Sequence, residues 1–229
     1  MAFDIEANKQ KFIQIYNGEI HREGADKLLS WLINSDFFEA PYTGQYVLSC
    51  KGGACQHALN TFKALSELVA KYRETDPLFL CDEEVKTRGT EEEKANAIAE
   101  LDQSVAIAGL LCEVGLANSW TPSVRSVQDS TGKWNKVPCW KWDEEFSYGG
   151  TGGKSAFIIQ QFMRLYIEEA QAIRFHKQGK EIPYGSNFED SFYSVYETNM
   201  FAALVGIAHN EAHNISDMII WNQTKPKLA

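Results

Sequence analysis

Potential metal ligands occur at several places in the sequence. His209 and His213 are four residues apart in a helical segment, so both side chains would point to one face and could share a metal ion. An accidental pair that includes one buried, hydrogen-bonded histidine explains the spacing equally well. Cys112 and Glu113 follow the apolar run 105–111. Cysteine packs there as a small hydrophobe, but a buried carboxylate is costly without a compensating cation, metal or donor. Glu113 therefore either faces a polar pocket or is turned towards solvent.

Residues 149–155 read Gly-Gly-Thr-Gly-Gly-Lys-Ser and have the composition of a phosphate-binding loop. The nucleoside-triphosphate motif needs glycine five positions before the Gly of Gly-Lys-Ser, where Tyr148 stands, and no buried parallel strand is expected before it. Lys154 and Ser155 nevertheless open a predicted helix, whose free N–H groups attract anions. A phosphate contact at this helix start and a simple capped turn remain the alternatives.

The elements that must position these residues are mostly helical. Helical spacing of apolar residues predicts helices near 12–16 and 28–33, over 54–72, from 90 to about 116, from about 153, over 166–177, and from about 190 or 200 to 221. Thr90, followed by three glutamates, predicts a helix N-terminus. Residues 35–53 predict a loop, and 118–152 an irregular hairpin inserted among the helices. We therefore predict a single all-α domain over 1–229, a bundle of roughly six to eight helices with a small irregular β-like insertion and a frayed tail at 223–229.

The composition excludes several classes of protein. Hydrophobic residues make up 44% and aromatic residues 12% of the chain, which is enough for a buried core. The net charge of −9 argues against non-specific binding to nucleic acids. No apolar stretch is long enough to span a membrane, and residues 1–10 lack the pattern of a signal peptide. We therefore expect a cytoplasmic protein without a membrane partner, whose five cysteines, with no Cys-X-X-Cys spacing, are reduced.

Several segments occur in the order that one protein family shows. They read Ser-Asp-Phe-Phe-Glu-Ala-Pro at 35–41, Lys-Gly-Gly-Ala-Cys-Gln-His-Ala-Leu-Asn at 51–60, Leu-Leu-Cys-Glu at 110–113, Gly-Gly-Lys-Ser at 152–155, Glu-Glu-Ala at 168–170, Ile-Arg-Phe-His at 173–176 and Ala-His-Asn-Glu-Ala at 208–212. From about residue 11 to 218 the chain resembles the HD-domain metal-dependent phosphohydrolases of bacteria and their phages. The resemblance implies an HD-like helical bundle.

The resemblance also implies a site. In that family two histidines and two aspartates hold a divalent ion, which activates water and neutralises charge on the phosphoryl group. The first histidine corresponds to His57, the His-Asp pair to Cys112 and Glu113, and the last aspartate to His209. A thiolate with two imidazoles would favour zinc over manganese or magnesium.

Other positions of the family carry over in part. Glu113 and His176 take the catalytic positions, and the candidate phosphate contacts are Lys154, Ser155 and Arg174. A further family histidine is replaced by Thr151 or Gly150, and a lysine by residues 115–116.

Three functions are compatible with these departures. In the first, the chain binds a nucleotide or another small phosphate ester, with hydrolysis reduced or lost because the His-Asp pair is Cys112-Glu113, and with or without a metal ion. In the second, a variant site of His57, Cys112, Glu113 and His209 still supports metal-dependent hydrolysis of a nucleotide. In the third, the chain is a non-enzymatic protein of phage origin that binds a host protein or forms a homo-oligomer. Its contact surface would then carry Trp134, Trp140 and Trp142.

Overall fold

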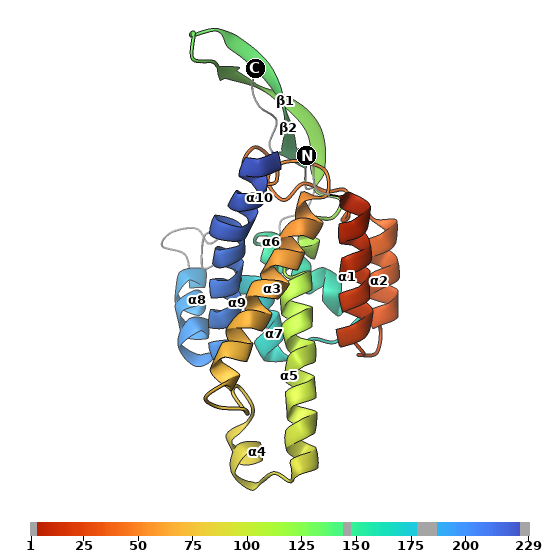
Figure 1. Ribbon diagram of the computed structural model, residues 1–229, viewed down its shortest axis with the longest axis vertical. Helices are drawn as coiled ribbons and strands as arrows, with labels where there is room; N and C mark the ends of the chain where they lie inside the picture. Colours follow the sequence, from red (N-terminus) through yellow and green to blue (C-terminus); the bar gives the residue numbers. More distant parts are fainter. Residues whose placement is uncertain (1–3, 144–147, 178–186, 225–229) are drawn as a thin grey trace.

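The computed structural model describes residues 4–143, 148–177 and 187–224, and it is mostly helical (Figure 1). The side chains of residues 187–191 are outside this description. The elements, in chain order, are α1 (Ile5–Glu19), α2 (Ala25–Asn34), α3 (Gly53–Arg73), α4 (Glu83–Arg88), α5 (Glu91–Leu111), the 3-10 turn η1 (Val114–Leu116), β1 (Trp120–Gln128), β2 (Trp134–Trp142), α6 (Thr151–Gln160), α7 (Ile167–Phe175), α8 (Asn187–Thr198), α9 (Met200–Glu211), the π turn η2 (Ala212–Ser216) and α10 (Asp217–Thr224).

The prediction of a helical fold with a small β insertion is confirmed, while the HD-like character stays a prediction. The described residues form ten α-helical segments rather than six to eight, because Asp82 caps the short α4 and the last helix is divided at Asn199 and at η2. The hairpin is regular rather than irregular, with an unbroken antiparallel register from Trp120↔Trp142 to Gln128↔Trp134. Of the predicted tail, α10 includes 223 and 224, and residues 225–229 lie outside the described residues, as do residues 144–147 of the predicted insertion.

Two long helices, α3 and α5, run side by side along the long axis of the molecule (Figure 1). The predicted cap of α5 is confirmed: Glu93 N donates to Thr90 Oγ1, and Thr90 N donates to the Glu93 carboxylate. Its second half, residues 105–111, is buried on every side, because α1, α3, α7 and α9 all pack against it. The α-helix ends at Leu111 rather than near 116, so Cys112 and Glu113 lie in the break before η1.

A Gly-Gly turn sets the start of α3, one turn ahead of His57. Gly52 has φ +79°, a left-handed conformation that favours glycine. A Cβ added to Gly53 would lie 2.1 Å from the Leu48 carbonyl oxygen and 2.8 Å from the Tyr42 nitrogen. The loop before α3 therefore packs directly on the backbone of the helix. Among the described residues, no helix combines the length and the apolar character that crossing a membrane requires.

We expect Gly53→Ala to lower the free energy of unfolding by about 1–3 kcal/mol, because the added methyl group must displace backbone atoms of this loop. The measurement is urea unfolding followed by circular dichroism. Gly18→Ala is the control, since a Cβ there meets nothing within 4 Å in α1. Alanine should raise the stability at this helical position. Equal unfolding midpoints for Gly53→Ala and the unchanged protein would show that the close approach of the loop backbone to Gly53 does not contribute to stability.

Candidate metal centre

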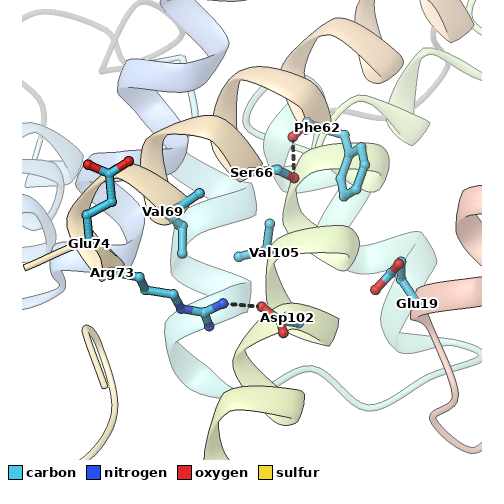
Figure 2. Close-up of a pocket in the computed structure, with 9 residues that line it drawn as sticks. Glu19, Phe62, Ser66, Val69, Arg73, Glu74, Asp102 and Val105 are labelled. Atoms are coloured by element: carbon cyan, nitrogen blue, oxygen red, sulfur yellow. Dashed lines mark hydrogen bonds and ion pairs between the residues drawn. The ribbon is translucent and has the colours of Figure 1, made fainter. Parts of the chain in front are cut away.

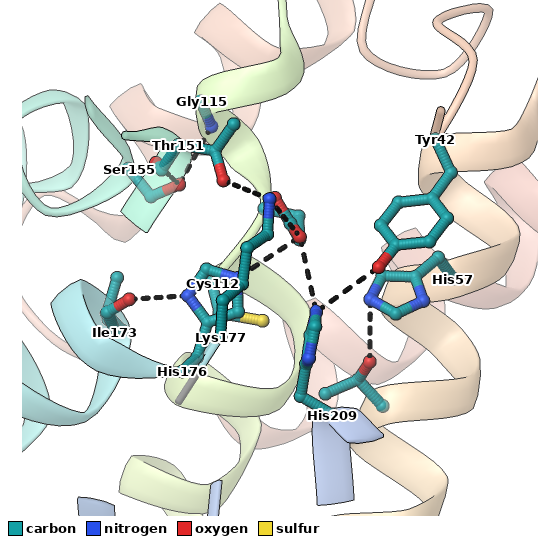
Figure 3. Close-up of polar contacts among 12 residues, drawn as sticks. Tyr42, His57, Cys112, Gly115, Thr151, Ser155, Ile173, His176, Lys177 and His209 are labelled. Carbon is teal, nitrogen blue, oxygen red and sulfur yellow. Dashed lines mark hydrogen bonds and ion pairs between the residues drawn. The ribbon is translucent and has the colours of Figure 1, made fainter. Parts of the chain in front are cut away.

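Four ionisable side chains gather where α3, α5, α7 and α9 meet. His57 comes from α3, Glu113 from the break after α5, His176 from the end of α7 and His209 from α9. Their exposed fractions are 0%, 0%, 0% and 2%. Figure 3 shows the three histidines pointing towards one region, together with Lys177 and Tyr42. The fold thus brings together residues that are up to 152 positions apart.

Glu113 contacts two of the histidines and a lysine in this cluster. Its Oε1 atom lies 3.1 Å from His176 Nε2, 3.1 Å from Lys177 Nζ and 3.3 Å from His209 Nε2. Burial acts to raise the pKa of Glu113, but Lys177 and the two histidines outweigh it and hold the pKa well below its usual range. The carboxylate is therefore ionised. Of the two alternatives left open by the sequence, Glu113 faces a polar pocket and is not turned towards solvent.

Hydrogen bonds from Nδ1 fix the rings of His57 and His176. His57 Nδ1 donates to Asp217 Oδ2 at 2.6 Å, and Asn60 Nδ2 donates to the second oxygen of Asp217 at 2.7 Å. His176 Nδ1 donates to the Ile173 carbonyl at 2.7 Å. In both rings Nδ1 therefore carries a proton, so Nε2 of a neutral ring has a lone pair. In His57 this atom lies 3.3 Å from Thr61 Oγ1, a contact that a bond to a metal would replace. A carboxylate that orients a histidine in this way is typical of metal sites.

The remaining contacts position His209. Burial lowers the pKa of His209 well below its usual value, although its contact with Glu113 acts in the opposite direction. The ring is therefore neutral, which is the form that binds metals. The Tyr42 hydroxyl lies 3.3 Å from His209 Nε2, while the Tyr42 ring stacks on His57 with 3.7 Å between the ring centroids.

The π turn η2 brings Asp217 to the cluster. In a regular α-helix, a residue eight positions after His209 would be turned by about 80° from it. A π turn contains one residue more than an α turn and so takes back about 100°. Asp217 consequently points to nearly the same side as His209, where it is fully buried against His57.

Three of the predicted ligands form a group that could hold a metal ion. One ligand atom from each of His57, Glu113 and His209 lies within 4.8 Å of the other two, and all three residues are buried. Glu113 Oε2 and His209 Nδ1 are buried and have no hydrogen-bond partner within the described ranges. Buried polar atoms without partners are costly, and an ion beside Glu113 Oε2 would remove part of that cost.

The other predicted ligands lie close by but outside this group. Cys112 is fully buried, and its thiol is 3.9 Å from the Gly109 carbonyl oxygen. Burial and then the charge of Glu113 raise the pKa of Cys112 well above the usual value, so the thiol keeps its proton, whereas metals bind the thiolate. All five cysteines are free. His213 lies in η2, with its ring parallel to that of His209 and 6.4 Å away.

Two of the predicted phosphate contacts, Ser155 and Lys154, make hydrogen bonds within the protein. Ser155 Oγ accepts from Gly115 N at 2.9 Å and donates to the Thr151 carbonyl at 2.8 Å, which ties α6 to η1. Lys154 Nζ donates to Ser119 Oγ and lies over the Trp142 ring. Arg174 is exposed beside the Phe175 ring. Lys177 is the cation that the structure places beside Glu113, and it also donates to Thr151 Oγ1 at 2.5 Å.

Sequence reasoning missed Tyr42, Lys177 and Asp217. Lys177 directly follows a predicted site histidine, which was an available signal. Asp217 precedes the apolar run 218–221, and a lone aspartate there is as informative as Glu113 after its own apolar run. Tyr42 lies in a loop without periodicity, so the sequence contains no comparable signal for it.

A separate hollow of about 490 Å³ lies between α3 and α5 on the side of α1 (Figure 2). Phe62, Val69 and Val105 line it, and Arg73 donates to Asp102 at 2.6 Å at one end. None of the predicted site residues lines this hollow. The hollow is therefore separate from the candidate metal ligands His57, Glu113 and His209. Comparisons with models of known families, with curated proteins and with solved structures found no match to this chain.

Proposed function

We propose that this chain is a metal-dependent hydrolase that acts on a nucleotide or another small phosphate ester. The observation that carries the proposal is the donor set of two histidines and one carboxylate, His57, His209 and Glu113, in one buried group. Three protein ligands of this kind are typical of catalytic zinc sites, which keep the fourth position for water. A closed site that included Cys112 would leave no such position, but the Cys112 thiol lies outside the group.

The residues around the donor set have separate roles in this proposal. A divalent ion held there would supply Lewis acidity and would lower the pKa of a bound water. Glu113, His57 and His209 would hold the ion. Lys177 Nζ, already beside Glu113 and Thr151, attracts the negative charge of a phosphoryl group. His176 Nε2, which lies 3.1 Å from Glu113 Oε1, would pass a proton to the leaving oxygen, because Nδ1 is committed to the Ile173 carbonyl.

The phosphate-ester class rests on the resemblance to HD-domain phosphohydrolases, and Lys177 supports it. A cation at the edge of a buried carboxylate–histidine cluster favours anionic ligands over neutral ones. Zinc is the expected ion, because imidazole is a better ligand for zinc than for magnesium. The alternative, a pocket that binds the ester without cutting it, uses the same residues and differs only in turnover.

Elemental analysis of the purified protein should find one divalent ion per chain, with zinc the best ligand in titrations. His57→Ala and His209→Ala should weaken zinc binding at least ~100-fold and abolish phosphate release from a panel of nucleotides. His21→Ala is the matched control, since His21 is exposed and lies outside the cluster. We expect it to bind zinc normally.

The outcomes separate the alternatives. If no metal is found, and zinc, manganese, cobalt and nickel all leave the melting temperature unchanged, the metal centre is refuted. If one metal binds and nucleotides raise the melting temperature without phosphate release, the chain is a binding protein that has lost hydrolysis. The size of that shift should follow the mass-action relation between ligand concentration and dissociation constant.

A further inference from the structure

The β1–β2 hairpin is an arm that leaves the helical body at one end of the molecule (Figure 1). Near its base, Trp140 N donates to the Gly44 carbonyl at 2.8 Å and Asp143 N to the Ser119 carbonyl at 2.9 Å. Further out, Trp134 is 66% and Val124 62% exposed, and the register places both on one face. A lone two-stranded hairpin is only marginally stable in water, so a partner that covers this face would stabilise the arm.

The arm is basic, whereas the rest of the chain is acidic. Residues 120–142 contain four basic residues, Arg125, Lys133, Lys136 and Lys141, and one acidic residue, Asp129, so their net charge is +3. The whole chain carries −9, which leaves −12 on the remaining residues. The lysines disfavour the pairing of two arms edge to edge. The acidic body disfavours nucleic acid as the partner, so the arm fits an acidic protein surface.

Such a surface is present at the opposite end of the same chain, at α4 and the start of α5 (Figure 1). Its acidic side chains are exposed and are Asp82, Glu83, Glu84, Glu91, Glu92 and Glu93. They outnumber the basic residues of the same segment, Lys86, Arg88 and Lys94, so residues 82–94 have a net charge of −3. A groove of about 540 Å³ adjoins them, lined by the apolar side chains of Leu80, Leu101 and Phe201 and by the acidic Asp82 and Glu100. An apolar groove with acidic neighbours is complementary to a tryptophan flanked by lysines.

We propose that the arm of one copy of this chain docks into the acidic groove of a second copy, with Trp134 inserted between Leu80 and Phe201. Lys133 and Lys136 then face the acidic residues of α4 and α5. A buried aromatic anchor surrounded by charge pairs is a common way to concentrate binding energy in a small interface. Each copy still presents one arm and one groove, so the contact is head to tail and produces a ring or an open chain. The assembly is independent of the metal centre.

Light scattering coupled to size-exclusion chromatography tests this assembly. The unchanged protein should be larger than a monomer at low salt and should dissociate as salt is raised, because the contact relies on exposed charges. Trp134→Ala and the double variant Lys133→Glu/Lys136→Glu should be monomers under both conditions. The matched control is Lys27→Glu/Lys71→Glu, which makes the same charge change at exposed positions of α2 and α3 and should still assemble.

A charge exchange identifies the groove. Glu83→Lys/Glu92→Lys should be monomeric alone, and mixing it with Lys133→Glu/Lys136→Glu should restore the large species, because each arm then meets a groove of opposite sign. A monomeric unchanged protein at all concentrations, a mixture that stays monomeric, or an assembly insensitive to Trp134→Ala would each overturn the proposal. So would single-stranded DNA that binds the arm in preference to a second copy.

Discussion

Glu113→Gln is expected to lower the free energy of unfolding by about 3–5 kcal/mol, the usual effect of removing one member of a buried ion pair. Lys177 Nζ lies 3.1 Å from the Glu113 carboxylate, and the side chains of the two residues are 19% and 0% exposed. The amide cannot compensate the lysine charge. The same change removes one of three metal ligands, so zinc binding should be lost as well. Chemical denaturation with and without chelator separates the two effects.

A double-mutant cycle with Lys177→Met separates the contribution of the Glu113–Lys177 ion pair to stability from the contribution of Glu113 to zinc binding. If the ion pair dominates, Glu113→Gln/Lys177→Met should recover part of the stability that Glu113→Gln loses, without recovering zinc binding. The matched control is Glu39→Gln, since Glu39 pairs with Lys51 at 2.7 Å but both side chains are more than 60% exposed. Its stability should hardly change. A double variant as unstable as Glu113→Gln would contradict the role assigned to Lys177.

Local sequence signals predicted most of the fold. Thr90 and the three glutamates after it predicted the start of α5, and the predicted loop over 35–53 placed the start of α3 within one residue. The end of α5 was predicted about five residues too late, because apolar periodicity continues through 114–116 although the backbone has already tightened into η1. Hydrophobic pattern alone does not distinguish these two kinds of helix.

Only part of the site was predicted, and that part followed from the cost of burying charge rather than from helical periodicity. A carboxylate next to an apolar run must have a partner, and that requirement pointed to Glu113 without any structure. Asp217 meets the same requirement, but its partner, His57, is 160 positions away in the sequence. A regular helix would also turn Asp217 away from His209. The π turn that corrects the direction has no reliable sequence signature, so this contact could be found only in three dimensions.

Asp217→Asn should weaken zinc binding about 10–100-fold, the usual effect of removing the charge of a residue that orients a metal ligand. Asparagine still accepts the hydrogen bond from His57 Nδ1, so the fold should be retained, while His57 becomes less basic. Competition with a chromophoric chelator measures the dissociation constant. Asp26→Asn, at an exposed position in the first turn of α2, is the matched control and should bind zinc normally.

Shortening η2 tests whether the metal centre depends on the direction of Asp217. Deletion of Asn214 alone leaves Asp217 seven residues after His209, and seven residues of a regular helix turn by about −20°, so Asp217 should still point towards His57 and zinc affinity should change little. Deletion of both Asn214 and Ile215 leaves six residues and rotates Asp217 by about 100° away from His57. Both deleted residues are exposed, so helicity by circular dichroism should be nearly unchanged in either variant. In the double deletion zinc affinity should fall at least as far as in Asp217→Asn, and adding Asp217→Asn to it should have no further effect, because the carboxylate no longer reaches His57. Equal zinc affinities in the single and the double deletion would show that the metal centre does not depend on the direction of Asp217.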